Sequence, residues 1–388
     1  MDTPDFLADP IYLDYNATTP VDPAVFQAML PYLERGFGNP SSTHLYGRKA
    51  HEAVDTAREQ VAHLLGCAPD EITFTAGGSE SDNLAIRGVA LALREQGNHI
   101  ITQVTEHPAV LKTCQALERL HGFCITYLPV DQYGQIDLEQ LEAAIDGSTV
   151  LITVMHANNE TGTLQPIAKI AEIAHRRGVL IHTDAAQSVG KISTNIQELG
   201  VDLLTVAGHK IYAPKGIGAL YIRHGVSVES IIYGGGQESG KRAGTENVPY
   251  MVALGTACAI AEKQLPESQL RLQALRNQLH RQLEEYLPGQ VHLNGHPHER
   301  LPNTLNVSID GVIGEEVLAA APGIASSTGS ACHEGNTEPS SVLLAMGFSR
   351  ERALGALRLT LGRWTTSTQV ENAARLLKKS VDSVQRKR

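Results

Sequence analysis

The feature that most restricts the fold of this chain is a series of short, almost uninterrupted apolar runs between helical segments, from about residue 50 to 225. Residues 149–155 (TVLITVM), 179–183 (VLIHT) and 203–207 (LLTVA) are apolar enough to be strands covered on both faces. Residues 50–65, 80–95 and 167–177 have helical periodicity, and the last of these ends at Gly178. This alternation predicts an α/β layer built on a largely parallel sheet.

The pattern changes near Thr245. The next 40 or so residues, to Tyr286, read as helix, and Pro266 predicts a break within them. Short strands (305–309 and 357–361) then alternate with helices (340–346 and 367–385). We therefore expect a second, smaller α+β domain, which agrees with the two or three domains that a chain of 388 residues usually forms.

Composition excludes several classes of protein. A net charge of −10 argues against a nucleic-acid-binding protein, which usually has a basic face. No apolar run approaches the length of about 18 residues that a membrane span needs, and the acidic N-terminus does not resemble a secretory signal. Five cysteines without a CxxC pair predict no disulfide framework, so we expect a protein of the reducing cytoplasm.

Lys210 directly follows the buried run 203–207, in the segment VDLLTVAGHKIYAPKGIG. Desolvation at such a position lowers the pKa of a lysine, which suits Schiff-base chemistry. The alternative is a surface lysine at the end of a strand.

Asp184 lies at the carboxyl end of the buried run 179–183, where open α/β sheets bind ligands. Its carboxylate could pair with a protonated pyridine nitrogen, and Gln187 could donate a hydrogen bond to a ring oxygen. The alternative for Asp184 is the N-cap of a helix.

Two further segments follow predicted strands. The segment TAGGSESDN (75–83) opens a helix with glycines and hydroxyls, a typical cradle for a phosphate, although Ser79 could equally cap an empty turn. In TEHP (105–108), His107 is a candidate for ring stacking and proton transfer, although most histidines have no such role.

Cys332 lies in IASSTGSACHEG (324–335), which has no apolar periodicity and therefore predicts a loop. A cationic His333 would favour its thiolate and Glu334 would oppose it. Without a partner cysteine, we expect no metal at Cys332. The other cysteines fit the usual behaviour of small buried hydrophobes: Cys67, Cys114, Cys124 and Cys258.

A lysine, an aspartate, a phosphate cradle and a stacking histidine, each after a strand of one sheet, describe a site for pyridoxal 5′-phosphate. With these motifs in this order, the chain resembles the cysteine desulfurases, the class V branch of the fold-type-I aminotransferases. The motifs that carry the resemblance are LDYNATTP (13–20), GNPSSTH (38–44), TEHPAV (105–110), HANNETG (156–162), HTDAAQSVGK (182–191), GHKIYAPKGIGALY (208–221), RAGTENV (242–248), SSTGSACHEG (326–335) and LRLTLGR (357–363).

The resemblance implies a large cofactor-binding domain with a mainly parallel seven-stranded sheet (residues 14–262). It implies a smaller α+β domain (residues 1–13 and 263–388) that carries the cysteine loop. It also implies a homodimer.

The resemblance further implies a role for each site residue. Lys210 would form the Schiff base, Asp184 would face the pyridine nitrogen, Gln187 the ring oxygen, and His107 would stack on the ring and act as acid or base. The phosphate would be held by Gly78, Ser79 and His209, with Thr245 from the other subunit. Asn158, which also borders the cofactor, and Arg358 would bind the substrate carboxylate, and Cys332 would be the sulfur-accepting nucleophile.

The implied activity is that of a cysteine desulfurase. L-cysteine would become L-alanine, and the sulfur would pass as a persulfide on Cys332 to an acceptor or scaffold protein that feeds iron–sulfur cluster assembly. Two departures from the family pattern favour the alternative of a selenocysteine lyase: Ala207 replaces a common serine, and His333-Glu334 replaces Thr-Ser. A non-catalytic scaffold on this fold would lack Lys210 or Asp184, and both are present.

Overall fold

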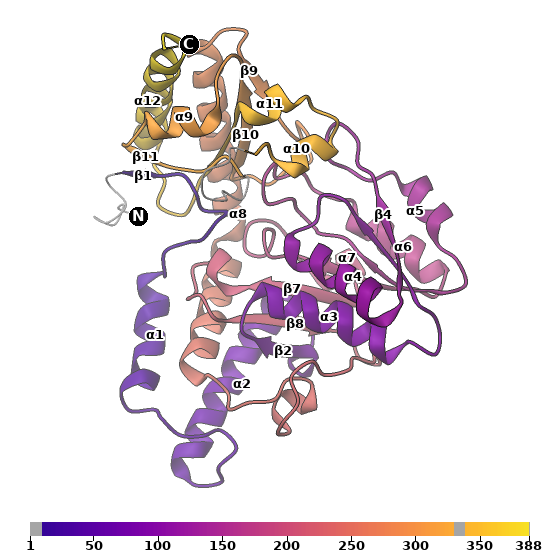
Figure 1. Ribbon diagram of the computed structural model, residues 1–388. Helices are drawn as coiled ribbons and strands as arrows, with labels where there is room; N and C mark the ends of the chain where they lie inside the picture. The colour runs from indigo at the N-terminus through magenta and orange to yellow at the C-terminus, as the bar shows by residue number, and fades with distance from the viewer. Residues whose placement is uncertain (1–9, 330–337, 388) are drawn as a thin grey trace.

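A computed structural model describes residues 10–329 and 338–387. Its centre is a seven-stranded sheet, seen as arrows in the lower half of Figure 1. β8 runs antiparallel to both of its neighbours, and the other strands pair in parallel, so the largely parallel sheet predicted from the sequence is confirmed. The strands lie in the order β2 (Ile72–Thr75), β8 (Gly218–Ile222), β7 (Leu203–Ala207), β6 (Leu180–Asp184), β5 (Thr149–Thr153), β3 (His99–Gln103) and β4 (Cys124–Leu128).

The apolar runs of the central strands arise because the sheet is covered on both faces. Successive residues point to opposite faces, so Leu203 packs with α3 (Gly78–Ala92) and α4 (Pro108–His121), whereas Leu204 packs with the core on the other side. The core on that other face includes residues of α2 (Leu45–Leu65) and α6 (Ile167–Arg176). Further helices are α1 (Pro23–Glu34), α5 (Leu138–Ala144) and α7 (Ile196–Leu199).

A second hydrophobic core lies around a small antiparallel sheet in the upper half of Figure 1. The sheet has the order β12 (Ala356–Thr360), β10 (Thr304–Ile309) and β9 (Val291–Leu293). It is flanked by α9 (Gly314–Ala319) and α12 (Ser367–Gln385), and α10 (Ser341–Ala345) and α11 (Arg350–Leu354) precede β12. The N-terminal β1 (Ile11–Tyr12) joins this part by pairing with β11 (Ile324–Ala325).

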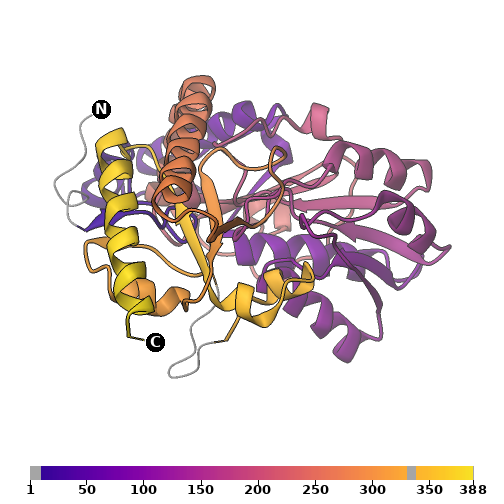
Figure 2. The ribbon, with the colours of Figure 1, turned by 90° about the horizontal axis from the view of Figure 1, so that it is seen from above.

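The expected break at Pro266 is wrong: α8 runs without interruption from Val248 to Tyr286. Proline removes one backbone hydrogen bond from a helix interior, but packing on either side of it offsets that cost. Before Pro266, α8 packs into the core of the large sheet through Leu254 and Cys258. Beyond it, α8 packs into the second core through Leu279 and Leu283, beside α12, as Figure 2 shows.

The cysteines divide differently from the prediction. Cys114 and Cys258 are buried, as expected, and Cys67 is half-buried. The expectation of burial is wrong for Cys124, which is exposed because it begins β4, the outermost strand of the large sheet. Within the described residues, no helix is both long enough and apolar enough to cross a membrane.

Candidate active site

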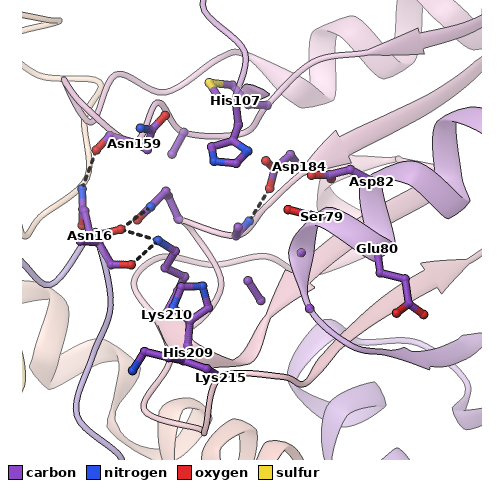
Figure 3. A pocket seen from close by; sticks show the side chains of 18 of the residues that line it. Asn16, Ser79, Glu80, Asp82, His107, Asn159, Asp184, His209, Lys210 and Lys215 are labelled. Carbon is purple, nitrogen blue, oxygen red and sulfur yellow. Dashed lines mark hydrogen bonds between the residues drawn. The ribbon is translucent and has the colours of Figure 1, made fainter. Parts of the chain in front are cut away.

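A cavity of about 710 Å³ opens where β6 and β7 end, and Arg358 of β12 contributes to its wall. Figure 3 shows side chains from several strand ends pointing into it. Most of the predicted site residues line this cavity: Gly78, Ser79, His107, Asp184, Gln187, His209, Lys210 and Arg358.

Lys210 lies in a short 3₁₀ turn, Gly208–Lys210, that follows β7 directly. Its Nζ donates to the backbone carbonyls of Asn16, at 2.6 Å, and Ala17, at 2.7 Å. Burial, together with the positive charge of Arg358, lowers the pKa of Lys210 to about 8, although the charges of Asp184 and Asp14 act in the opposite direction. The side chain is therefore an amine that is partly neutral near physiological pH, which a nucleophile or a base requires.

Asp184 is the last residue of β6 and is buried at the edge of the cavity. Its Oδ1 accepts a hydrogen bond from the backbone N–H of Ala186 at 2.9 Å, within a turn and not at the start of a helix. Burial raises the pKa of Asp184, whereas the charges of His107 and Lys210 lower it. A buried carboxylate of this kind gains from a cationic partner in the cavity.

Asp82, on α3, is a second buried carboxyl that lines the cavity, next to Asp184 in Figure 3. Burial and the neighbouring charge of Asp184 hold the pKa of Asp82 well above its usual range. The two carboxyls therefore disfavour two simultaneous negative charges at this end of the cavity.

The start of α3 forms the predicted anion cradle. Gly77, with φ of 144°, precedes the helix, and no side chain caps it, so Ser79 is not the N-cap. The positive end of the helix dipole and the first N–H groups of α3 therefore face the cavity at Gly78 and Ser79. Ala207 lies against this turn from the end of β7.

Two histidines border the cavity, and the pKa of each is lowered. His107 is the N-cap of α4, where its Nδ1 accepts from the N–H of Ala109 at 3.1 Å, so the hydrogen of the neutral ring is on Nε2. Burial lowers the pKa of His107. Burial, reinforced by the charge of Lys210, lowers the pKa of His209 to about 4.

Arg358 reaches the cavity from the small sheet. Its Nη2 donates to Asp14 Oδ1 and to Ser327 Oγ, both at 2.9 Å, and its Nη1 donates to the carbonyl of Asn159 at 3.3 Å. Its Nε, although buried, has no partner among the residues that the structure describes. The guanidinium is thus held in place, and the second N–H of Nη1 is left for an anion.

Comparisons with known proteins agree with this geometry. Residues 11–373 match the family model described as Aminotransferase class-V. The chain is 48% identical, over 96% of its length and 93% of the relative, to a protein of Klebsiella pneumoniae subsp. pneumoniae named Cysteine desulfurase IscS. The chain belongs to the cysteine desulfurase family. Because the enzymes of this family depend on pyridoxal phosphate, so does this one.

Solved structures agree with the assignment to the desulfurase family. A structure titled NifS-like protein superposes with a TM-score of 0.90 at 37% identity and covers 96% of this chain and 99% of its own. Another, titled SspA in complex with cysteine, has a TM-score of 0.81 at 39% identity and covers 92% of this chain and 99% of its own. The fold-type-I architecture predicted from the sequence is confirmed.

The desulfurase cofactor fits the residues present. The cavity offers an amine at Lys210, a buried carboxylate at Asp184 and a helix N-terminus at Gly78. These groups match the aldehyde, the pyridine nitrogen and the phosphate of pyridoxal phosphate. Asp82 Oδ1 is buried without a hydrogen-bond partner within the described residues, so a polar group is still expected at this end of the cavity.

Among the described residues, two of the predicted ones, Thr245 and Asn158, do not line the cavity. Thr245 is exposed in the segment before α8. Asn158 is buried, and its side chain donates to the carbonyl of Thr105 at 3.1 Å and accepts from the N–H groups of Glu160 and Thr161 at 2.9 Å. Cys332, with its neighbours His333 and Glu334, lies outside the described residues.

No local pattern marked Asn16, Asp82 or Lys191 as site residues, although each lies within one of the motifs given above. Asn16 and Asp82 line the cavity, and Lys191 lies directly behind it, bonded to Asn16 and Gln187. The sequence signal for Lys191 was its spacing, because it follows the predicted site residue Gln187 by four positions.

Proposed function

We propose that this chain converts L-cysteine to L-alanine and transfers the sulfur, as a persulfide on Cys332, to an acceptor protein. The observation that carries the proposal is the convergence of Lys210, with its depressed pKa, and the buried Asp184 on one cavity. The relative solved with cysteine supports the choice of substrate. Measuring alanine and sulfide formed from cysteine by the purified holoenzyme tests the proposal.

Lys210 would hold the cofactor and then move the proton of the substrate Cα. Bound pyridoxal phosphate supplies an electron sink for the negative charge that develops at that carbon. Asp184 would face the pyridine nitrogen and keep it protonated, since a buried carboxylate stabilises a neighbouring cation. Gln187 would donate to the ring oxygen.

The phosphate would be bound at the start of α3, by the N–H groups and hydroxyl at Gly78 and Ser79, together with His209. A neutral His209 contributes a hydrogen bond there without adding a charge. We infer that Thr245 reaches the phosphate of the other subunit in a homodimer, because the exposed Thr245 lies away from the cavity of its own chain.

Substrate binding would depend on the small sheet. Arg358, held by Asp14 and Ser327, would bind the substrate carboxylate through its remaining donors. Asn158 would assist by holding residues 158–161 in a turn, since the carbonyl of Asn159 accepts from Arg358. His107 would exchange a proton with the substrate sulfur through Nε2.

The role of Cys332 rests on the sequence motif. Its thiolate would attack the substrate sulfur and form a new S–S bond while the carbon–sulfur bond of the substrate breaks. The sulfur would remain on Cys332, and the carbon skeleton, after taking up a proton, would leave as alanine. The persulfide sulfur would then pass to an acceptor or scaffold protein, which uses it as the sulfur source in iron–sulfur cluster assembly.

The second candidate is a selenocysteine lyase, favoured by Ala207 and by the His333-Glu334 pair. Initial rates on cysteine and selenocysteine, measured with the same enzyme, distinguish the two.

We also propose that the enzyme is cytoplasmic. We propose a large domain of residues 14–262 and a small domain of residues 1–13 and 263–388. The division of α8 between two hydrophobic cores supports this boundary.

A further inference from the structure

Lys191 is a buried lysine in the turn that follows β6, behind the cavity wall. Its Nζ donates to the side-chain oxygen of Gln187 at 2.9 Å and to the side-chain oxygen of Asn16 at 3.2 Å. Neither partner is a carboxylate, so within the described residues no ion pair accounts for the burial of this amine, and burial lowers the pKa of Lys191 well below its usual range. A lysine in such surroundings calls for an explanation beyond packing.

Gln187 is the residue that Lys191 orients most directly. The Gln187 Oε1 faces Lys191, and the Gln187 Nε2 donates to the backbone carbonyl of Asn16 at 2.9 Å. A flipped amide would set donor against donor at Lys191 and acceptor against acceptor at Asn16, so the pair of contacts selects one orientation. Since Nε2 carries two hydrogens, the second is left for the cavity that Gln187 lines.

Asn16 extends this arrangement to Lys210. Its backbone carbonyl accepts from both Gln187 Nε2, at 2.9 Å, and Lys210 Nζ, at 2.6 Å. Its side-chain oxygen accepts from Lys191, and from Asn303 at 3.0 Å. Lys191 therefore contacts both residues that position the polar groups on this side of the cavity.

We propose that Lys191 is a positioning residue, which holds the Gln187 amide and Asn16 so that a Gln187 N–H faces the cofactor cavity. The inference deepens the proposed function and rests on it, because the acceptor for that N–H would be the ring oxygen of pyridoxal phosphate. Lys191 itself does not line the cavity. Its effect on the bound cofactor must therefore pass through the Gln187 amide, which Lys191 holds directly and through Asn16.

The test is a double-mutant cycle with Lys191→Met and Gln187→Met, read by cofactor affinity and by the visible spectrum of the bound cofactor. Apoenzyme is titrated with pyridoxal phosphate. We expect Lys191→Met to weaken binding by up to about tenfold, the upper end for loss of one hydrogen-bond contact, and to shift the absorption maximum. The exposed Lys169→Met on α6 is the matched control and should change neither.

In the Gln187→Met background, Lys191→Met should cause little further loss of affinity and no further spectral shift. An equal, additive loss in that background would overturn the proposal, as would an unchanged affinity and spectrum in Lys191→Met alone. If Lys191→Met does not fold, Lys191→Gln takes its place in both backgrounds. These readouts need no turnover, so wild-type enzyme that binds the cofactor but forms no alanine from cysteine would overturn only the proposed activity.

Discussion

The methyl group of Ala207 lies against Gly78: a Cβ built on Gly78 would be 3.2 Å from the Ala207 Cβ. The end of β7 and the start of α3 therefore meet at the site proposed for the phosphate. Both residues line the cavity, so a hydroxyl added at position 207 would enter the cradle itself.

Ala207→Ser should therefore tighten binding of pyridoxal phosphate. A hydrogen bond to a charged acceptor is worth roughly 1.5–3 kcal/mol, so we expect the dissociation constant to fall about tenfold. Titration of the apoenzyme, followed by absorbance or fluorescence, measures it. A dissociation constant that stays the same or rises in Ala207→Ser would show that the phosphate is not bound at this turn.

Capture of the cofactor should depend on pH through Lys210. Only the neutral amine adds to an aldehyde. The pKa of Lys210 is lowered to about 8, and burial is the largest cause of this shift. The rate of capture by apoenzyme should therefore be low below pH 7, rise through pH 8 and level off above it. Stopped-flow absorbance between about pH 6.5 and 11 gives the midpoint.

Lys210→Ala should show no such capture, whereas the exposed Lys169→Ala should behave as wild type. A midpoint near the ordinary lysine pKa of about 10.4 would contradict the depressed value.

Asp184→Asn should lower turnover on cysteine by at least about a hundredfold, the usual cost of removing one preorganised charge. The fold should survive, because the asparagine Oδ1 can still accept from the N–H of Ala186. The melting temperature should not fall, since the variant removes a buried carboxyl whose pKa burial raises. Steady-state kinetics and thermal melts check both points. Near-normal turnover would show that Asp184 only stabilises the turn in which it accepts from Ala186.

Mixing two inactive variants should restore activity if the site is shared. Heterodimers of Lys210→Ala and Thr245→Ala chains contain one site with both lesions and one with neither. We expect up to a quarter of wild-type activity when equal amounts of the chains exchange at random, since half of the dimers then carry one intact site. No recovery despite proven exchange would place Thr245 outside the partner's site.

Cys332→Ala should separate sulfur from selenium chemistry. A cysteine thiol is mostly protonated at neutral pH and leaves poorly without a nucleophile, so activity on cysteine should vanish. A selenol is more acidic and its bond to carbon is weaker, so a substantial part of the activity on selenocysteine should remain. Sulfide release from cysteine at the wild-type rate in Cys332→Ala would exclude the persulfide mechanism.

The sequence predicted best those elements whose hydrophobic pattern is unambiguous. β7 and α12 have the expected bounds, because an uninterrupted apolar run and an amphipathic period each leave one solution. Lys210 and Asp184 were found because carboxyl ends of parallel strands meet at one edge.

Other features depend on tertiary contacts that no local pattern carries. α8 continues past Pro266 because both of its halves are packed. The importance of Asn16 was hidden because its backbone carbonyl, present in every residue type, is what accepts from Lys210. The sequence could not distinguish Asn158 from Asn159, because only the fold determines that Asn159 lines the cavity and Asn158 does not.

The uninterrupted α8 also determines how Arg358 and Lys210 can move relative to each other. Arg358 belongs to the small sheet and Lys210 to the large one, and α8 is a single rod anchored in the cores of both. Any movement that separates Arg358 from Lys210 would have to bend α8. The helix is weakest at Pro266, because proline has no N–H to donate to the carbonyl of Glu262. Bending at Pro266 would therefore change the distance between Arg358 and Lys210, the residues that we propose bind the substrate carboxylate and the cofactor.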